Sequence, residues 1–177
     1  PTIELPASPQ PFPMLAPPAV VSDLGLRPSA PMAPPRALAC NPLGSVFGVA
    51  SELLQCGRAK FQRGELEPAR ADLAAAVQKS SDRQVSREAR YWLAETLVRQ
   101  RRADAAEAHL AMVARDDPNG ELGAYAAQTL ACLLLERGEA AQALPLAEGL
   151  LRGGAPPDLI PPARHVRGLA LSALGRP

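Results

Sequence analysis

Three cysteines and two histidines are the side chains best suited to metal or thiol chemistry, and their spacing limits what they can do. The cysteines are Cys40, Cys56 and Cys132, and the histidines are His109 and His165. A structural zinc site needs four clustered cysteine or histidine ligands, and the sequence has no C-x-x-C pair, so we expect no metal site. Cys40 and Cys56 are 16 residues apart, a separation that a disulfide can close. Two alternatives stay open: reduced thiols, or a Cys40–Cys56 bridge formed in an oxidising compartment.

No other residue pattern indicates catalysis or a bound cofactor. His109 and Glu107 are two residues apart, which places them on different faces of a helix. The acidic run at 116–119 lacks the spacing and the glutamate of a calcium loop, and the chain has no glycine-rich phosphate loop. We therefore expect a protein that is not an enzyme and binds no cofactor, the alternative being an accessory domain of a larger enzyme.

Composition and charge exclude two further classes of partner. The 177 residues are 47% apolar and 21% charged, with a net charge of +1. This balance gives no electrostatic reason for binding nucleic acid, and the arginines between residues 83 and 102 are interleaved with acids, as on a solvated surface. The longest apolar run covers residues 130–135, far short of a membrane span.

Residues 1–45 differ from the rest of the chain by their proline content, since they hold 12 of its 20 prolines. Proline removes a backbone donor and fixes φ, which favours polyproline II and turns over helix. Because apolar residues are interleaved with the prolines, we interpret this segment as an extended docking arm that lies on this domain or on another chain. A disordered linker is the alternative. The residues expected to make the contacts of the arm are Phe12, Met14, Leu15, Val20, Val21 and Leu24.

Residues 46–177 repeat with a period of 37. Gly64, Arg101, Gly138 and Gly175 are each 37 residues apart. Each unit has the pattern of a helix, a short turn and a second helix, which is typical of a solenoid. The expected repeats are residues 50–86, 87–123 and 124–160, with a partial repeat at 161–177. Small residues at one equivalent position are expected to let neighbouring helices approach closely; these are Gly57, Ala94, Ala131 and Gly168.

The second unit shows this pattern most clearly. It carries in order a leucine, a small residue, a large residue, an alanine, a large apolar residue and a proline, namely Leu93, Ala94, Leu97, Ala106, Leu110 and Pro118. This order and spacing resemble the tetratricopeptide repeat. The resemblance covers residues 46–177, although Lys60 stands where a large apolar residue is usual in the first unit. It implies an all-α solenoid of about 3.5 repeats acting as a protein–protein interaction scaffold.

The resemblance also implies where a partner binds. In a tetratricopeptide stack the first helix of each repeat lines a concave groove, and a mixed surface with two tyrosines suits an extended or helical peptide. For Tyr91 and Tyr125 the alternative is packing between repeats, and Glu95 and Arg99 are spaced so that they can pair with each other. The expected groove residues are Leu54, Arg58, Phe61, Tyr91, Glu95, Val98, Arg99, Tyr125, Gln128, Cys132, Glu136 and His165.

A finer resemblance concerns residues 89–97, which read Ala-Arg-Tyr-Trp-Leu-Ala-Glu-Thr-Leu. This helix is similar to one in tetratricopeptide proteins of the bacterial envelope, such as the Tol-Pal-associated division coordinator and the lipoprotein of the barrel-assembly machine. The resemblance implies a periplasmic scaffold in a larger envelope complex that binds through the arm and the groove. A cytoplasmic adaptor or chaperone is the alternative.

The two ends of the sequence give a last expectation. The chain begins with Pro1 rather than methionine, and it ends on an apolar helix expected at residues 163–176. Because solenoid ends normally carry a polar cap, we expect a fragment or processed product of a longer protein, or a partner that covers the last helix.

Overall fold

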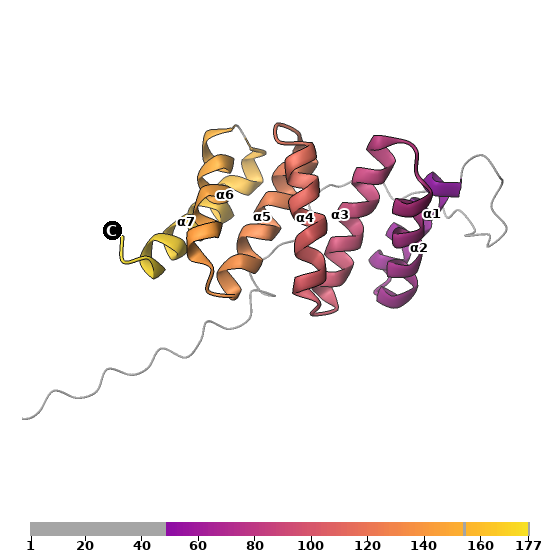
Figure 1. Ribbon diagram of the computed structural model, residues 1–177, viewed down its shortest axis with the longest axis horizontal. Helices are drawn as coiled ribbons and strands as arrows, with labels where there is room; N and C mark the ends of the chain where they lie inside the picture. Colours follow the sequence, from indigo (N-terminus) through magenta and orange to yellow (C-terminus); the bar gives the residue numbers. More distant parts are fainter. Residues whose placement is uncertain (1–48, 154, 177) are drawn as a thin grey trace, which may run out of the picture.

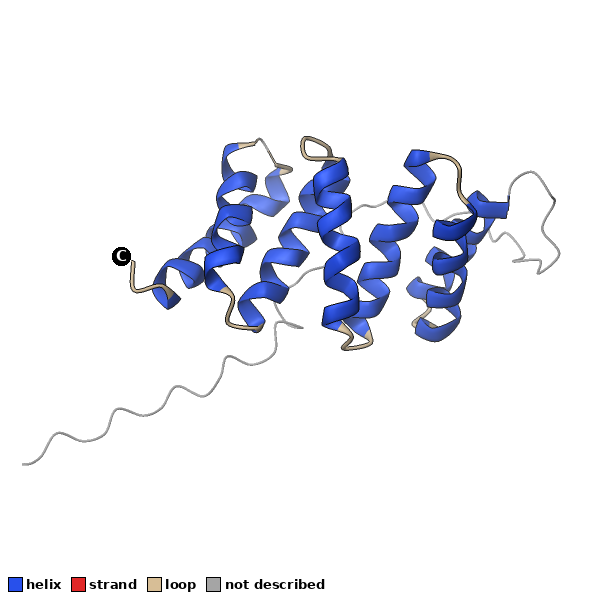
Figure 2. Cartoon of the chain, in the orientation of Figure 1, coloured by secondary structure: helices blue, strands red, loops and turns tan. Residues whose placement is uncertain are grey.

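A computed structural model describes residues 49–153 and 155–176. Within these ranges the chain forms seven α-helices, one short 3-10 helix and no strand. The helices follow one another along the long axis of the molecule (Figures 1 and 2). The expected all-α solenoid is thus confirmed. The helices are α1 (Val49–Gln62), α2 (Leu66–Lys79), α3 (Arg83–Arg99), α4 (Ala103–Asp116), α5 (Glu121–Glu136), α6 (Ala140–Arg152), η2 (Pro157–Leu159) and α7 (Ile160–Ala173).

The α-helices form two layers. In the inner layer, α1, α3, α5 and α7 each contact the next helix of this set. In the outer layer, α2, α4 and α6 each pack between two helices of the inner layer. The pairs α1–α2, α3–α4 and α5–α6 are therefore three copies of one unit, and α7 occupies the place of a fourth first helix.

Each outer helix contributes an equivalent stripe to the core. The stripe consists of three buried apolar residues at positions i, i+4 and i+7, which lie on one face of a helix. The three stripes are 37 residues apart and consist of Ala69, Leu73 and Ala76, then Ala106, Leu110 and Val113, then Ala143, Ala147 and Leu150. The period seen in the sequence is thus the period of core packing.

The turns that follow α1, α3, α5 and α7 share one backbone geometry. One residue is left-handed, with φ of 79° at Gly64, 61° at Arg101, 80° at Gly138 and 64° at Gly175. In every case its N–H donates to the carbonyl three residues back, and the next N–H donates to the carbonyl five residues back. This is the Schellman motif that ends many helices. Glycine adopts it without strain, whereas a left-handed L-residue costs about 1–2 kcal/mol. Arg101 is the only non-glycine with positive φ in the described ranges.

Close helix approach is found at three of the four predicted small residues. A Cβ added to Gly57 would lie 2.5 Å from Leu73 Cγ, and Ala94 and Ala131 are fully buried. The prediction is wrong at Gly168, which is exposed and has no atom within 4 Å of an added Cβ. The reason is that no helix within the described ranges stands beside α7 as α2 stands beside α1.

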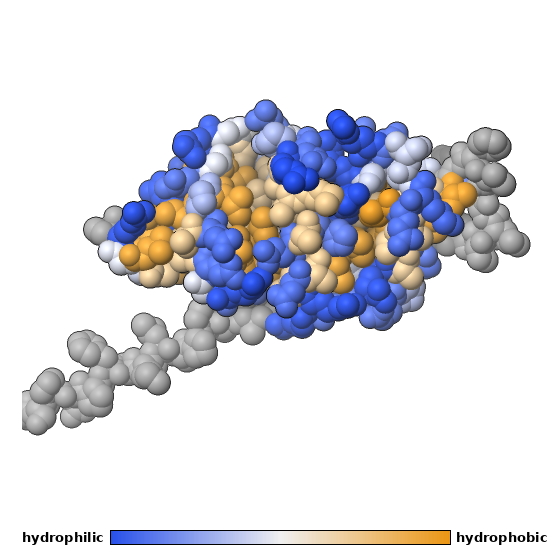
Figure 3. Space-filling model, in the orientation of Figure 1, coloured by the Kyte–Doolittle hydropathy of each residue, from blue (hydrophilic) through white to orange (hydrophobic). Residues whose placement is uncertain are grey.

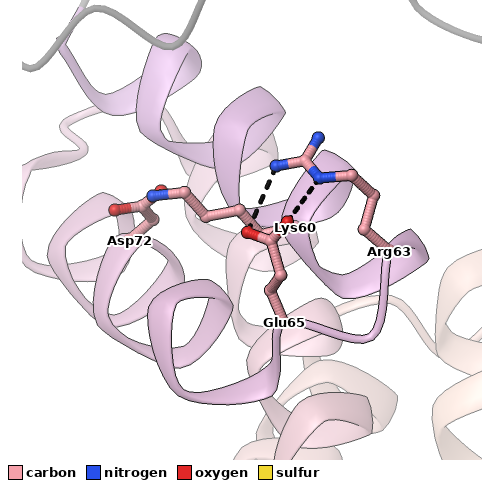
Figure 4. A network of polar contacts seen from close by, with 4 residues as sticks. All are labelled: Lys60, Arg63, Glu65 and Asp72. Carbon is pink, nitrogen blue, oxygen red and sulfur yellow. Dashed lines mark hydrogen bonds and ion pairs between the residues drawn. The ribbon is translucent and has the colours of Figure 1, made fainter.

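The chain departs locally from the repeat pattern at two places. α7 begins at Ile160 rather than at the expected residue 163, because Pro161 and Pro162 lie in the first helical turn, where a missing N–H breaks no hydrogen bond. Lys60 stands where a large residue is usual, and its Nζ lies 2.6 Å from Asp72 Oδ2, an ion pair that joins α1 to α2 (Figure 4).

Candidate functional site

Equivalent side chains of the inner layer form rows across the repeats. We call the side of α1, α3, α5 and α7 that faces away from the outer layer the inner face. The 37-residue period places one residue from each helix in a row. The first row consists of Leu54, Tyr91, Gln128 and His165, and the second consists of Arg58, Glu95, Cys132 and Leu169. Every groove residue expected from the sequence belongs to one of these four helices.

Aromatic and cationic side chains join α1 to α3. The rings of Phe61 and Trp92 meet edge to face with their centroids 5.4 Å apart, and those of Tyr91 and Trp92 are 5.5 Å apart. The guanidinium carbon of Arg58 lies 5.1 Å from the Trp92 ring centre, and that of Arg99 lies 3.9 Å from the Phe61 ring centre. These are cation–π distances. The contacts therefore bring three expected groove residues together around a tryptophan.

A partly buried carboxyl group, that of Glu95, joins α3 to α5. The Thr129 hydroxyl donates to Glu95 Oε1 at 3.0 Å. Burial raises the pKa of the Glu95 carboxyl, while the Thr129 hydrogen bond and the Arg99 charge act in the opposite direction. Burial also raises the pKa of the Tyr91 hydroxyl well above its ordinary value. Tyr91 therefore remains a hydrogen-bond donor at any physiological pH.

Replacing Glu95 with glutamine is expected to change how stability depends on pH. The folded chain binds the Glu95 proton more tightly than the unfolded chain, because its folded pKa is raised. The free energy of unfolding therefore falls as pH rises from the unfolded pKa, about 4.3, through the folded one. We expect Glu95→Gln to match the parent near pH 3.5 and to exceed it at pH 7.5 in urea unfolding.

A second variant tests the same account of Glu95. Thr129→Val removes the hydrogen bond that favours the charged carboxylate, so the loss of stability between pH 3.5 and pH 7.5 should be larger than in the parent. Identical pH profiles for the parent and Glu95→Gln would contradict the assignment.

Gln128 is the least satisfied polar residue of the inner face. Its side chain is 1% exposed, and its Nε2 donates to Cys132 Sγ at 3.5 Å. Its Oε1 is buried and accepts no hydrogen bond from the part of the chain that the structure describes. A buried unpaired acceptor costs about 1–3 kcal/mol. Burial raises the pKa of the Cys132 thiol to about 11, so this neighbour stays protonated and unreactive.

The far end of the inner face combines polar and apolar groups. The Tyr125 hydroxyl donates to Asp158 Oδ2 at 2.7 Å, which joins α5 to η2. On α7, His165 is exposed, and Leu169, in the row of Glu95, is 45% exposed. The inner face at α7 therefore exposes a histidine and a leucine in place of the arginine and aromatic rings found at α1 and α3.

The expected groove residues differ in exposure. Leu54, Phe61, Tyr91, Gln128 and Cys132 are buried, Arg58, Glu95, Val98 and Tyr125 are intermediate, and Arg99, Glu136 and His165 are exposed. The expected arm contacts between residues 12 and 24, and Cys40, lie outside the described residues. Cys56 is partly buried on α1, and its pairing with Cys40 stays a prediction.

Comparison with known families agrees with this architecture. The family model for the tetratricopeptide repeat matches residues 60–130, which run from the end of α1 into α5. The match and the helical repeat architecture together support a tetratricopeptide-repeat protein. No curated protein matches it in sequence. Tetratricopeptide repeats form a protein-interaction fold that is generally not catalytic.

Two features are absent from the described part of the chain. Within residues 49–153 and 155–176, no three His, Cys, Asp or Glu side chains are grouped so that they could hold a metal ion. No helix in those ranges is both long and apolar enough to cross a membrane.

Sequence reasoning missed two partners on the inner face of the tetratricopeptide domain. Thr129, which binds Glu95, and Asp158, which binds Tyr125, were not among the expected site residues. Thr129 follows Glu95 by 34 residues and Asp158 follows Tyr125 by 33. Residues separated by slightly less than one repeat therefore contact each other across neighbouring helices. The spacing could have been read from the sequence as a signal for both partners.

The tetratricopeptide domain also has a groove in its outer layer. A groove of about 970 Å³ lies between α4 and α6, with α5 as its floor. Its lining is mostly apolar and includes Ala114, Leu130, Pro145, Leu146 and Leu150. Figure 3 shows hydrophobic residues gathered in this part of the surface.

Proposed function

We propose that this protein is a non-catalytic scaffold that binds an extended segment of a protein partner along the inner face, centred on Gln128. The observation that carries the proposal is the buried Oε1 of Gln128, which lacks a donor within the described residues. An extended segment presents backbone N–H groups that are not used internally. Because this oxygen is buried, one of them donates to it only when the side chains that cover it move aside on binding.

The neighbours of Gln128 support binding of an extended backbone. Tyr91 occupies the same row on the adjacent helix and keeps its hydroxyl proton, so it can donate to a carbonyl of the bound segment. Gln128 therefore supplies an acceptor and Tyr91 supplies a donor. This pairing recognises a backbone, which offers both groups at every non-proline residue.

We further propose that the proline-rich residues 1–45 take part in binding and that the protein works in a complex of the bacterial envelope, in the periplasm. The first part is supported by the apolar residues interleaved with the prolines. The second is supported by the similarity of residues 89–97 to envelope tetratricopeptide proteins.

Affinity capture tests the site. The full chain, Gln128→Leu and a chain lacking residues 1–45 are used as baits against separate periplasmic and cytoplasmic extracts, and the captured proteins are quantified by mass spectrometry. Gln128→Leu should bind the partner about two- to tenfold more weakly, the value of one hydrogen bond. Its stability should be unchanged or higher, because leucine removes the unpaired acceptor.

The matched control for capture is Gln78→Leu, the same substitution at an exposed position of α2. It should capture the partner as the parent does. Equal capture by the parent and Gln128→Leu contradicts the inner-face site. Unchanged capture without residues 1–45 contradicts the role of the arm, and enrichment only from the cytoplasmic extract contradicts the periplasmic location.

A further inference from the structure

The turn between α3 and α4 differs from its equivalents in backbone strain. The same left-handed position is occupied by Gly64, Gly138 and Gly175 in the other three turns, and by Arg101 here. The hydrogen bonds of the four turns are the same, so the fold does not require a side chain at this position. An arginine held in a conformation that glycine adopts more easily points to a role for its guanidinium group.

The same turn also differs in charge. In the first turn Arg63 Nε lies 2.7 Å from Glu65 Oε1 (Figure 4), and in the third turn Arg137 Nη2 lies 2.8 Å from Glu139 Oε1. The residue equivalent to these glutamates in the second turn is Arg102. In the first and third turns a glutamate at this position pairs with an arginine of its own turn. In the second turn the same position holds Arg102, a second cation next to Arg101.

No acidic side chain forms an ion pair with Arg101 or Arg102 in the described ranges, and both are exposed. Arg99 stacks on Phe61, and its charge acts on Glu95 of the same helix. The acids at this edge have other partners. Glu67 pairs with Arg70, while Asp104 and Glu107 of α4 both pair with Arg137 of the turn after α5.

We infer that the α3–α4 turn is a contact site for an acidic segment of a protein partner, with Arg101 and Arg102 as the residues that bind its carboxylates. Arginine binds carboxylates through planar, charge-assisted hydrogen bonds. Nucleic acid fits the site less well, because the turn offers few cations, Asp104 beside it is 93% exposed at its side chain, and the chain carries a net charge of only +1. The inference does not depend on the inner-face site.

The test uses the full chain and a fluorescein-labelled decaglutamate peptide, with binding followed by fluorescence anisotropy at about 20 mM salt, where surface charges are weakly screened. The variant Arg101→Gly/Arg102→Glu gives the turn the Gly-Glu sequence of the first and third turns. It should bind the peptide about tenfold more weakly, since one pair is lost and one is reversed. Its thermal midpoint should be at least that of the parent, because the left-handed arginine is gone.

The matched control is Arg164→Gln/Arg167→Glu, which makes the same charge change at exposed positions of α7. It should bind decaglutamate as the parent does. A similar loss in the control, or no loss in the turn variant, overturns the inference. It is also overturned if a 20-nucleotide single strand binds more tightly than the peptide and loses affinity in the turn variant, because the site would then select nucleic acid. The single variant Arg102→Glu gives the same readout without changing residue 101.

Discussion

Replacing Phe61 with alanine is expected to lower the free energy of unfolding by about 3–5 kcal/mol, the usual range for a buried phenylalanine. Phe61 is 1% exposed. Its ring packs on Trp92 and lies beneath the guanidinium group of Arg99, so the substitution leaves a cavity at the junction of the first two repeats. Trp92 is the only tryptophan of the chain, and its fluorescence in urea unfolding reports directly on this junction.

Phe61→Leu is the control for the cavity, because it keeps most of the apolar volume. It should cost clearly less than the alanine variant, about 1 kcal/mol. A loss below about 1 kcal/mol for Phe61→Ala would contradict a structural role for this ring. It would instead agree with the sequence-based interpretation of Phe61 as a groove residue available to a partner.

Replacing Gly123 with alanine is expected to cost about 3 kcal/mol, the upper part of the range for overpacking. A Cβ at this position would overlap with the backbone carbonyl oxygen of Asp117, and a backbone group cannot rotate away as a side chain can. The Gly123 N–H also donates to Asp117 Oδ2 at 3.3 Å. The substitution should therefore displace the turn that joins α4 to α5, and urea unfolding measures the loss.

Gly168→Ala provides the matched control, because Gly168 also lies in a helix but has no atom within 4 Å of an added Cβ. Alanine is a better helix former than glycine, so this variant should gain about 0.5–1 kcal/mol. Opposite signs at the two positions are expected. Equal effects would contradict the close approach of Asp117 to α5.

The repeat architecture could be predicted because it depends on patterns that the sequence carries directly. The 37-residue spacing of Gly64, Gly138 and Gly175 reflects a backbone conformation that favours glycine, and the buried stripes reflect helical periodicity. The position of Arg101 in the same series could also be predicted. The strain at Arg101 could not be predicted, because only the backbone shows that this position is left-handed in all four turns.

The candidate site was less predictable, since its residues depend on contacts between helices. The sequence placed Glu95 on the correct helix and left open an interaction with Arg99, whose charge does oppose the rise that burial causes in the pKa of Glu95. It did not indicate the hydrogen bond from Thr129 of the next repeat. The unpaired oxygen of Gln128 depends on how tightly α3, α5 and α7 pack. No spacing rule within one helix contains that information.

The row arrangement of the helices affects how the molecule comes apart. Within the described ranges the main contacts of every α-helix are with neighbours at most two places away, so opening can start at either end and spread inward, as in other linear arrays. A segment lying across α1, α3 and α5 would touch all three units, including the first and the third, which make no main contact with each other. The bound segment would hold the units together. Amide hydrogen exchange of the terminal helices should therefore slow together when the segment is bound.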